Sequence, residues 1–231
     1  MMSHLLAASL VAVSVVPWKT TRGMQGSRIA TLTASLSAAE PESRGRAACD
    51  LRELGDNAAP AIASLVALLA DGAPLNRTVC ERTWWRGDKN DLTSPGELAA
   101  SALVAIGSQA YSPVLTALRS TAWIARRNAA WALGALDDER AINALIEALH
   151  DPEPAVRAQV AWALGALDAN SAVPALMAAL KDKDVAVRRQ VAWALGAIGD
   201  KRAVDALIPA LKDEDTVVRR QAAWAIGAIG K

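Results

Sequence analysis

The sequence predicts an all-α solenoid, a stack of about six pairs of short helices. Residues 181–200 and 212–231 are identical at fourteen of twenty positions, which indicates a 31-residue repeat. Within each unit, apolar residues recur at the three- and four-residue spacing of helices that face a core. A repeat of this length is typical of stacked helical units, each of which buries its apolar face against its neighbours.

Each unit contains a first helix of the type AV.ALI.AL and a second helix of the type VR..VAWALGAI. The first helices are expected within residues 27–39, 57–71, 109–120, 139–151, 170–182 and 201–213. The second helices are expected within residues 41–56, 94–107, 120–138, 151–169, 181–200 and 212–231. The two earliest second helices are fainter copies, in which Cys49 and Ser101 stand at the position of the later tryptophans.

Glycine and aspartate mark the predicted helix boundaries. Gly55, Gly107 and Gly199 stand where a second helix should end, because glycine tolerates a left-handed cap. Aspartates that can cap the second helices precede them at positions 151, 184 and 215.

The predicted repeat domain covers residues 27–231 and carries an insertion at 71–95. The preceding segment, 1–26, contains an apolar run of twelve residues at 5–16, shorter than the roughly 20 that cross a bilayer. The run fits the apolar part of a signal peptide, although residues 1–4 lack lysine and arginine and no clear cleavage site follows. We expect an exported or periplasmic protein. The alternatives are a cytoplasmic protein with a packed or disordered N-terminal segment, a start at Met24, or an uncleaved segment that touches the membrane.

The two cysteines bear on the same question. Cys49 lies in the first of the second helices, and Cys80 lies in the insertion. If the chain is exported, we expect a disulfide between them that holds the insertion against the early helices.

A tryptophan returns every 31 residues on a face turned away from the core. With Val156 as reference, Val160, Leu164 and Leu167 form the core stripe of their helix, and Trp162 falls far outside it. The same face carries Trp131, Trp162, Trp193 and Trp224, with Arg127, Arg189 and Arg220 four residues before three of them, and Gln159, Gln190 and Gln221. We expect a partly exposed row of indoles with guanidinium groups beside them, which binds a partner and contributes little to stability. The alternative is that the tryptophans are structural or inherited by duplication.

A second series of arginines lies at the edge of the core stripe. We expect Arg126, Arg157, Arg188 and Arg219 to pair with Asp137, Asp168 and Asp200, which end the same helices, in a structural ladder between repeats.

These repeats resemble HEAT-like repeats of the phycobilisome-lyase type. The residues that carry the resemblance are Val156-Arg157, Ala161, Ala163-Leu164-Gly165 and the helix that starts near Ala172. The resemblance is strong over 109–231 and weaker over 40–107, and it says little about 1–26 and 71–95. It extends to engineered helical-repeat binders, and it implies a right-handed solenoid that uses the concave face of its second helices, here at Ala155, Ala158, Gln159 and Trp162. The family also includes bilin lyase subunits.

Composition and motifs exclude several classes of function. The net charge of +1 argues against nucleic acid as a partner, even though indoles can stack on bases. With two histidines, no HExxH and no phosphate-binding glycine loop, the sequence predicts no catalytic residues, no metal site and no cofactor. We therefore expect a non-enzymatic scaffold that binds a protein or peptide. A subunit that handles a tetrapyrrole is the alternative suggested by the family, and nucleic-acid binding is a second alternative.

Overall fold

The computed structural model describes residues 18–75, 79–80 and 94–230, with side-chain surroundings from residue 25 onward. Twelve α-helices in these residues form six pairs, which confirms the predicted all-α solenoid. The predicted N-terminal apolar run, with residues 76–78 and 81–93 of the predicted insertion, lies outside the described residues.

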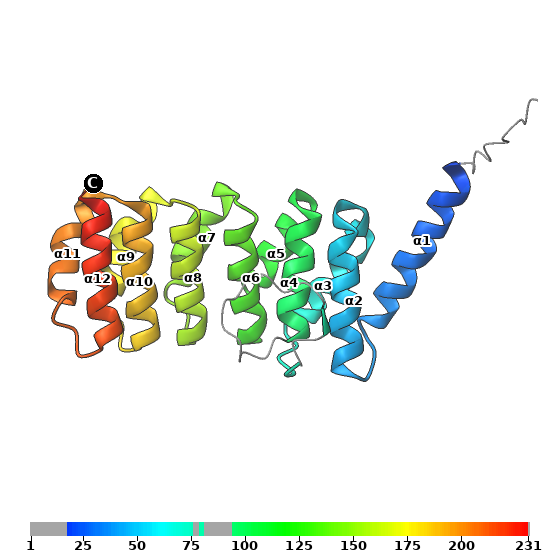
Figure 1. The fold of residues 1–231 in the computed structure, drawn as a ribbon, viewed down its shortest axis with the longest axis horizontal. Helices are drawn as coiled ribbons and strands as arrows, with labels where there is room; N and C mark the ends of the chain where they lie inside the picture. The colour runs from blue at the N-terminus through cyan, green and yellow to red at the C-terminus, as the bar shows by residue number, and fades with distance from the viewer. Residues whose placement is uncertain (1–17, 76–78, 81–93, 231) are drawn as a thin grey trace, which may run out of the picture.

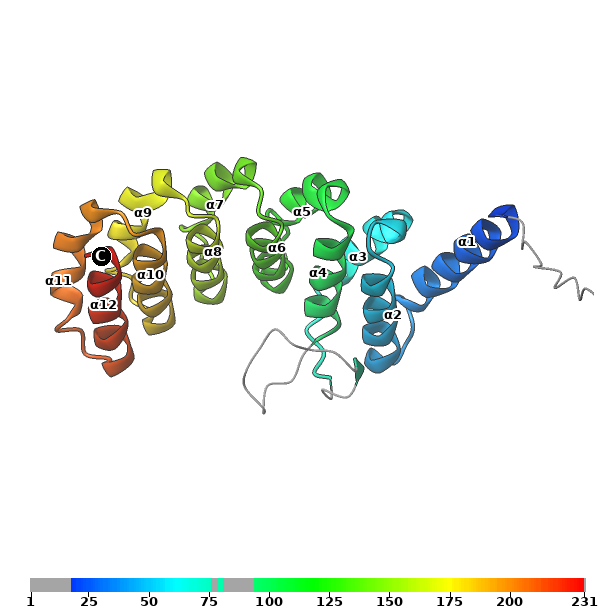
Figure 2. The same ribbon diagram turned by 45° about the horizontal axis from the view of Figure 1, so that its top comes forward.

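The first helices of the pairs, apart from α1, form an outer layer, and the second helices form an inner layer (Figures 1 and 2). The first helices are α1 (Trp18–Ser35), α3 (Ile62–Leu68), α5 (Tyr111–Ala117), α7 (Ile142–Ala148), α9 (Val173–Ala179) and α11 (Val204–Ala210). The inner helices are α2 (Pro41–Glu53), α4 (Pro95–Ile106), α6 (Trp123–Ala135), α8 (Pro154–Ala166), α10 (Val185–Ile198) and α12 (Thr216–Ile229).

Short 3₁₀ helices lead into every outer helix after α1. They are η1 (Gly55–Ala61), η3 (Ser108–Ala110), η4 (Glu139–Ala141), η5 (Asn170–Ala172) and η6 (Lys201–Ala203). In Figure 2 the outer helices from α3 onward follow the convex side of the arch, the inner helices stand side by side along its concave side, and α1 extends away at an angle from the end of the stack. Helix α1 begins at Trp18, ahead of residue 27, where the sequence analysis places the start of the repeats. None of the described helices is both long and apolar enough to cross a bilayer.

The core lies between the two layers and is built from the predicted stripe. Val156, Val160, Leu164 and Leu167 of the α8 segment are all buried, and the corresponding residues of the other pairs continue the same core. Alanine fills most remaining buried positions, which lets neighbouring inner helices approach closely. The helical periodicity of the sequence therefore identifies the core correctly.

The helix ends follow from local chemistry. Gly55, Gly107 and Gly199 all have positive φ angles. Gly199 adopts the predicted left-handed cap, whereas Gly107, with a ψ angle of −145°, ends its helix in a more extended conformation. The side chains of Asp184 and Asp215 accept hydrogen bonds from the first backbone N–H groups of α10 and α12, so both are caps. The third predicted cap, Asp151, instead accepts from the Glu153 backbone N–H, outside the helix.

The predicted insertion begins by packing on α2. A disulfide joins Cys49 of α2 to Cys80, with Cα atoms 6.1 Å apart, and both cysteines are buried. The side chain of Leu75 is also buried and lies over Gly45, where a β-carbon would approach its methyl group to 2.7 Å. The start of the insertion is thus held to α2 by a covalent bond and by apolar contact.

Arginines of the inner helices link each pair to the next, as predicted, but their partners differ from the prediction. The Arg157 guanidinium donates from Nε and Nη2 to the two carboxylate oxygens of Asp182, at 2.6 and 2.8 Å. Its Nη1 donates to the backbone carbonyls of Asp151 and Pro152, in the turn before its own helix. Arg126 and Arg188 repeat this arrangement with Asp151 and Asp213, and Arg44 donates to Asp71. Each guanidinium therefore joins the turn of its own pair to the turn of the following pair.

Asp137, Asp168 and Asp200 are not the partners of these arginines, which corrects the prediction. They lie at the carboxyl ends of the inner helices, and the arginines lie near the amino ends. Eleven residues of helix separate Arg157 from Asp168, or about 16 Å. Asp137 and Asp168 have positive φ angles of 55° and 49° and occupy the capping position that Gly199 fills in the next repeat. Asp200 caps η6 through the Arg202 backbone N–H.

The turn carboxylates should make the fold sensitive to acid. Hydrogen bonds from Arg157 and Arg188 lower the pKa of Asp182 and of Asp213, against an opposing effect of burial. A carboxyl whose pKa is lower in the folded state stabilises the fold above its unfolded pKa of about 3.9 and loses that contribution as the pH falls.

We therefore expect the contribution of Asp182 and Asp213 to the free energy of unfolding to be constant from pH 7 to 5 and to decrease below about pH 4. Urea titrations at a series of pH values measure this, with Asp213→Asn as the variant that should lose part of the dependence. An identical acid profile for the variant would contradict the assignment.

Candidate functional site

The inner helices α6, α8, α10 and α12 lie in contact, each with the next, along the concave side. Their face turned away from the outer layer carries the predicted site residues, which we call the indole surface. It consists of Trp131, Trp162, Trp193, Trp224, Gln159, Gln190, Gln221, Arg189 and Arg220. Trp224 is 47% exposed, and the other three tryptophans and the three glutamines are half-buried. The row of indoles therefore opens to solvent most fully at α12.

Each indole of α8, α10 and α12 rests on a glycine of the preceding inner helix. A β-carbon on Gly165 would lie 2.8 Å from Cζ3 of Trp193, and one on Gly196 would lie 2.6 Å from Cζ3 of Trp224. Gly134 stands in the same relation to Trp162. The rings of Trp131 and Trp162 also stack, with centroids 6.4 Å apart and an angle of 13° between their planes. The indoles thus contribute to the packing between repeats, which the sequence analysis did not expect.

This packing changes the expected effect of truncation. Trp193→Ala should lower the free energy of unfolding by about 2 kcal/mol, since full burial of a tryptophan is worth roughly 3–5 kcal/mol and Trp193 is half-buried. Trp224→Ala should cost about 1 kcal/mol, because its indole is more exposed. Urea unfolding followed by circular dichroism measures both. Equal losses below about 0.5 kcal/mol would instead show that the indoles contribute nothing to the packing between repeats.

The guanidinium groups do not lie where the four-residue spacing predicts. Arg127 donates from Nη2 to Glu97 Oε1 at 2.9 Å and lies over the ring of Trp123, 5.7 Å from its centroid, rather than over Trp131. This ion pair holds the Arg127 guanidinium beside α4 and away from the row of indoles. Arg127 therefore belongs to a local cluster at the amino ends of α4 and α6.

Arg189 and Arg220 are exposed, and within the described residues neither makes a hydrogen bond, an ion pair or a contact with an aromatic ring. Because a solvated guanidinium gains little from an exposed indole, these side chains stay free at the surface. Their charges are available to a partner.

Trp123 and Glu97 were not predicted as site residues. They line a small cavity of about 260 Å³ together with Arg127, Ile124, Ser94, Gly72 and Pro74. Trp123 is 40% exposed and lies four residues before Arg127. A search for aromatic residues four positions before each arginine, as well as four positions after it, would have found Trp123. Asn128, which aligns with the glutamines, is buried and donates to the Leu69 carbonyl.

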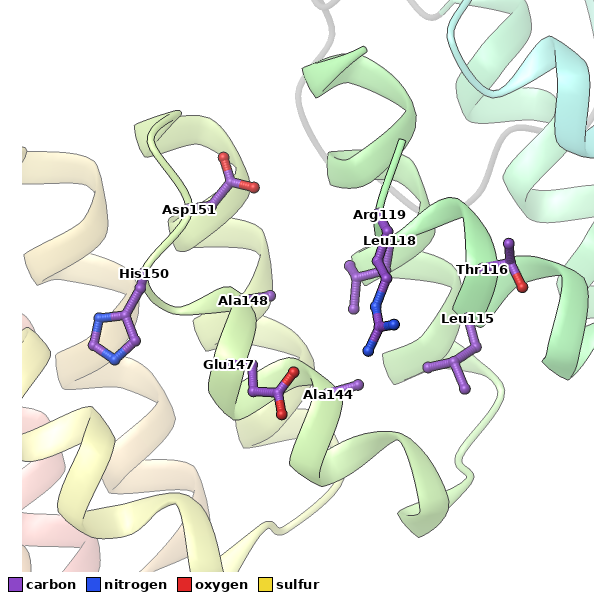
Figure 3. A pocket seen from close by; sticks show the side chains of 9 residues that line it. All are labelled: Leu115, Thr116, Leu118, Arg119, Ala144, Glu147, Ala148, His150 and Asp151. Atoms are coloured by element: carbon purple, nitrogen blue, oxygen red, sulfur yellow. The ribbon is translucent and has the colours of Figure 1, made fainter. Parts of the chain in front are cut away.

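The outer layer holds a groove between α5 and α7, of about 460 Å³. Figure 3 shows Arg119 and Glu147 pointing into it, whereas His150 points away. Its floor is apolar, with Leu115 and Ala144. Alanine recurs at the position of Ala144 in α9 and α11, so the groove results from the repeat geometry. No group of three or more His, Cys, Asp or Glu that could hold a metal ion occurs in the described residues.

Comparison with protein families supports the repeat assignment. The family description "HEAT repeats" matches residues 97–154, 111–191 and 174–231, which together cover more than half of the chain. The chain belongs to the HEAT-repeat family. A search of curated proteins finds no match to the sequence.

Solved structures with the same HEAT architecture come from several kinds of protein. The complex of CpcE and CpcF of phycocyanin lyase from Nostoc sp. PCC7120 has a chain that is 26% identical, with a TM-score of 0.53, over 88% of this chain and 77% of that one. A crystallised engineered protein is 21% identical, with a TM-score of 0.52, over 87% of this chain and 98% of that one. Kap121p is 17% identical, with a TM-score of 0.70, over 91% of this chain and 26% of that one. The last two resemblances support the fold alone.

Proposed function

We propose that this HEAT-repeat protein is a non-enzymatic scaffold that binds a protein or peptide on the indole surface. The observation that carries the proposal is the row of indoles along four neighbouring inner helices, flanked by two exposed arginines without partners in the described residues. Tryptophan and arginine are the side chains most often found at the energetic centre of protein interfaces. The concave face of a solenoid offers such residues to an elongated partner.

The experiment adds bulk and charge to the surface without removing packing. Ala166 and Ala197 are exposed and follow Trp162 and Trp193 by four residues, so they lie on the same face. We expect the variant Ala166→Glu/Ala197→Glu to keep its thermal stability and to lose its partner in quantitative affinity capture from the native host. The matched control is Ala178→Glu on the outer helix α9, which should retain the partner. Equal retention of the same partner by all forms would exclude the indole surface as its binding site.

A second candidate is a subunit that handles a tetrapyrrole, favoured by the similarity to a chain of the phycocyanin lyase complex. The indoles offer flat apolar faces on which such a ligand could stack. Protein purified from its native host should then absorb visible light, with a loss of colour in the Ala166→Glu/Ala197→Glu variant. Colourless wild-type protein from a pigment-producing host argues against this candidate.

We further propose that the protein works in an oxidising compartment. The disulfide between Cys49 and Cys80 supports this, because structural disulfides persist mainly outside the reducing cytosol. Alkylation of acid-trapped protein from the native host should leave both thiols unmodified until a reductant is added. Two alkylated cysteines before reduction would place the protein in a reducing compartment.

A further inference from the structure

Over α8, α10 and α12, the charged side chains of the indole surface are all positive. The inner-helix segments 155–166, 186–197 and 217–228 contain no aspartate or glutamate. Of their five arginines, Arg157 and Arg188 are buried and paired with turn aspartates. Arg219 is half-buried, and its guanidinium donates to the backbone carbonyls of Asp213 and Glu214 in the turn before its helix. The fully exposed guanidinium groups of these segments are therefore those of Arg189 and Arg220.

Carboxylates at the edge of the surface are already engaged. Asp184 and Asp215, five residues before Arg189 and Arg220, cap α10 and α12 by accepting from backbone N–H groups. Asp182 and Asp213 accept from the buried guanidinium groups. A partner that neutralises Arg189 and Arg220 must bring its own negative charges.

The spacing of the two arginines limits the form of that partner. They occupy equivalent positions on adjacent inner helices, and packed helices lie about 8–10 Å apart. A polyproline-II segment advances about 3.1 Å per residue with three residues per turn, so every third side chain points the same way at a spacing of about 9 Å. An extended segment that crosses α10 and α12 therefore presents one side chain of the same face to each arginine.

The indoles suit the same conformation. Trp193 and Trp224 lie four residues after the two arginines, on the same face of their helices. Aromatic side chains recognise the proline-rich ridges of polyproline-II segments, whose preformed shape lowers the entropy cost of binding. The glutamines Gln190 and Gln221 can hydrogen-bond to the exposed backbone of such a segment.

Resting on the proposed scaffold function, we propose that the indole surface over α10 and α12 binds an extended acidic segment in the polyproline-II conformation, with a carboxylate at every third residue. The carboxylates pair with Arg189 and Arg220, and the intervening residues pack on Trp193 and Trp224. Partner recognition is thus set by charge and by a three-residue period together.

The test uses fluorescein-labelled peptides and the full chain, with binding measured by fluorescence anisotropy at low salt. The first peptide contains four repeats of Glu-Pro-Pro. A neutral control replaces each glutamate with glutamine, and a scrambled control has the same composition with its glutamates contiguous. The protein variants are Arg189→Gln/Arg220→Gln and, as a control away from the indole surface, Arg202→Gln, whose exposed side chain on η6 pairs with Asp200.

We expect the periodic acidic peptide to bind, with an affinity that falls as NaCl is added. Its affinity should drop roughly ten-fold for the neutral peptide and for the Arg189→Gln/Arg220→Gln variant, and several-fold for the scrambled peptide, since each exposed ion pair contributes a modest factor. Arg202→Gln should bind like the wild type.

Two results would overturn the inference. Equal affinity for the neutral peptide removes the charge requirement, and equal affinity for the scrambled peptide removes the three-residue period. Failure of all peptides to bind also overturns it. None of these results affects the scaffold proposal, which stands or falls on partner capture by the Ala166→Glu/Ala197→Glu variant.

Discussion

Replacing Arg188 with alanine should lower the free energy of unfolding by about 3 kcal/mol, because it leaves a mostly buried aspartate without its counter-charge. The Arg188 side chain is 9% exposed and donates from Nε and Nη2 to Asp213, at 2.7 and 3.0 Å. Its Nη1 donates to the carbonyls of Asp182 and Lys183. One substitution thus removes the ion pair to the next repeat and the bonds to its own turn.

The chain contains a matched control for the ion pair. Arg219 occupies the same position in the last repeat and makes the same turn contacts, through Nη1 to the carbonyls of Asp213 and Glu214. Within the described residues no carboxylate pairs with it. Arg219→Ala should therefore cost only about 1 kcal/mol, the worth of the turn hydrogen bonds. Urea unfolding of both variants measures the difference, and equal losses would show that the inter-repeat ion pair contributes nothing.

The aspartates that pair with the inner-helix arginines could have been identified from the sequence. The sequence predicts that these arginines pair with Asp137, Asp168 and Asp200 in a ladder between repeats, because a partly buried arginine needs such partners. The helix rise excludes that pairing, since Arg157 and Asp168 lie at opposite ends of α8. Asp151, Asp182 and Asp213 recur with the same 31-residue period, 25 residues after the arginines. A comparison of all the aspartate series that share this period would have found them.

The face of the tryptophans was predictable, but their packing was not. Helical periodicity separates Trp162 from Val156, Val160 and Leu164, and the structure keeps that separation. A projection of one helix contains no information about the neighbouring helix, however. The contact between Trp193 and Gly165 joins residues 28 positions apart, and it depends on how closely α8 and α10 approach. How deeply each indole is buried therefore depends on how the neighbouring repeats pack, which the sequence of one helix does not show.

The close approach of the inner helices leads to a second large effect. Gly165→Val should destabilise the protein by about 3 kcal/mol, at the upper end of overpacking costs. A β-carbon at position 165 would lie 2.9 Å from the Ala194 Cα atom and 2.8 Å from Cζ3 of Trp193. The first of these atoms belongs to the backbone of α10, so the helix itself must shift. The glycine in the repeated sequence AWALGA is then required by the tryptophan and alanine of the next repeat.

Gly227 provides the control, because it holds the same position in α12 and a β-carbon there would meet nothing within 4 Å. Gly227→Val should change the free energy of unfolding by less than about 0.5 kcal/mol, since valine and glycine differ little in helix propensity. Urea unfolding of the two variants separates the explanations. If both substitutions are equally harmful, the cost comes from the local helix and not from the contact between repeats. If only Gly165→Val is harmful, each indole is held in place by its contact with a glycine of the preceding inner helix. The packing distance between inner helices then determines the spacing of the indoles.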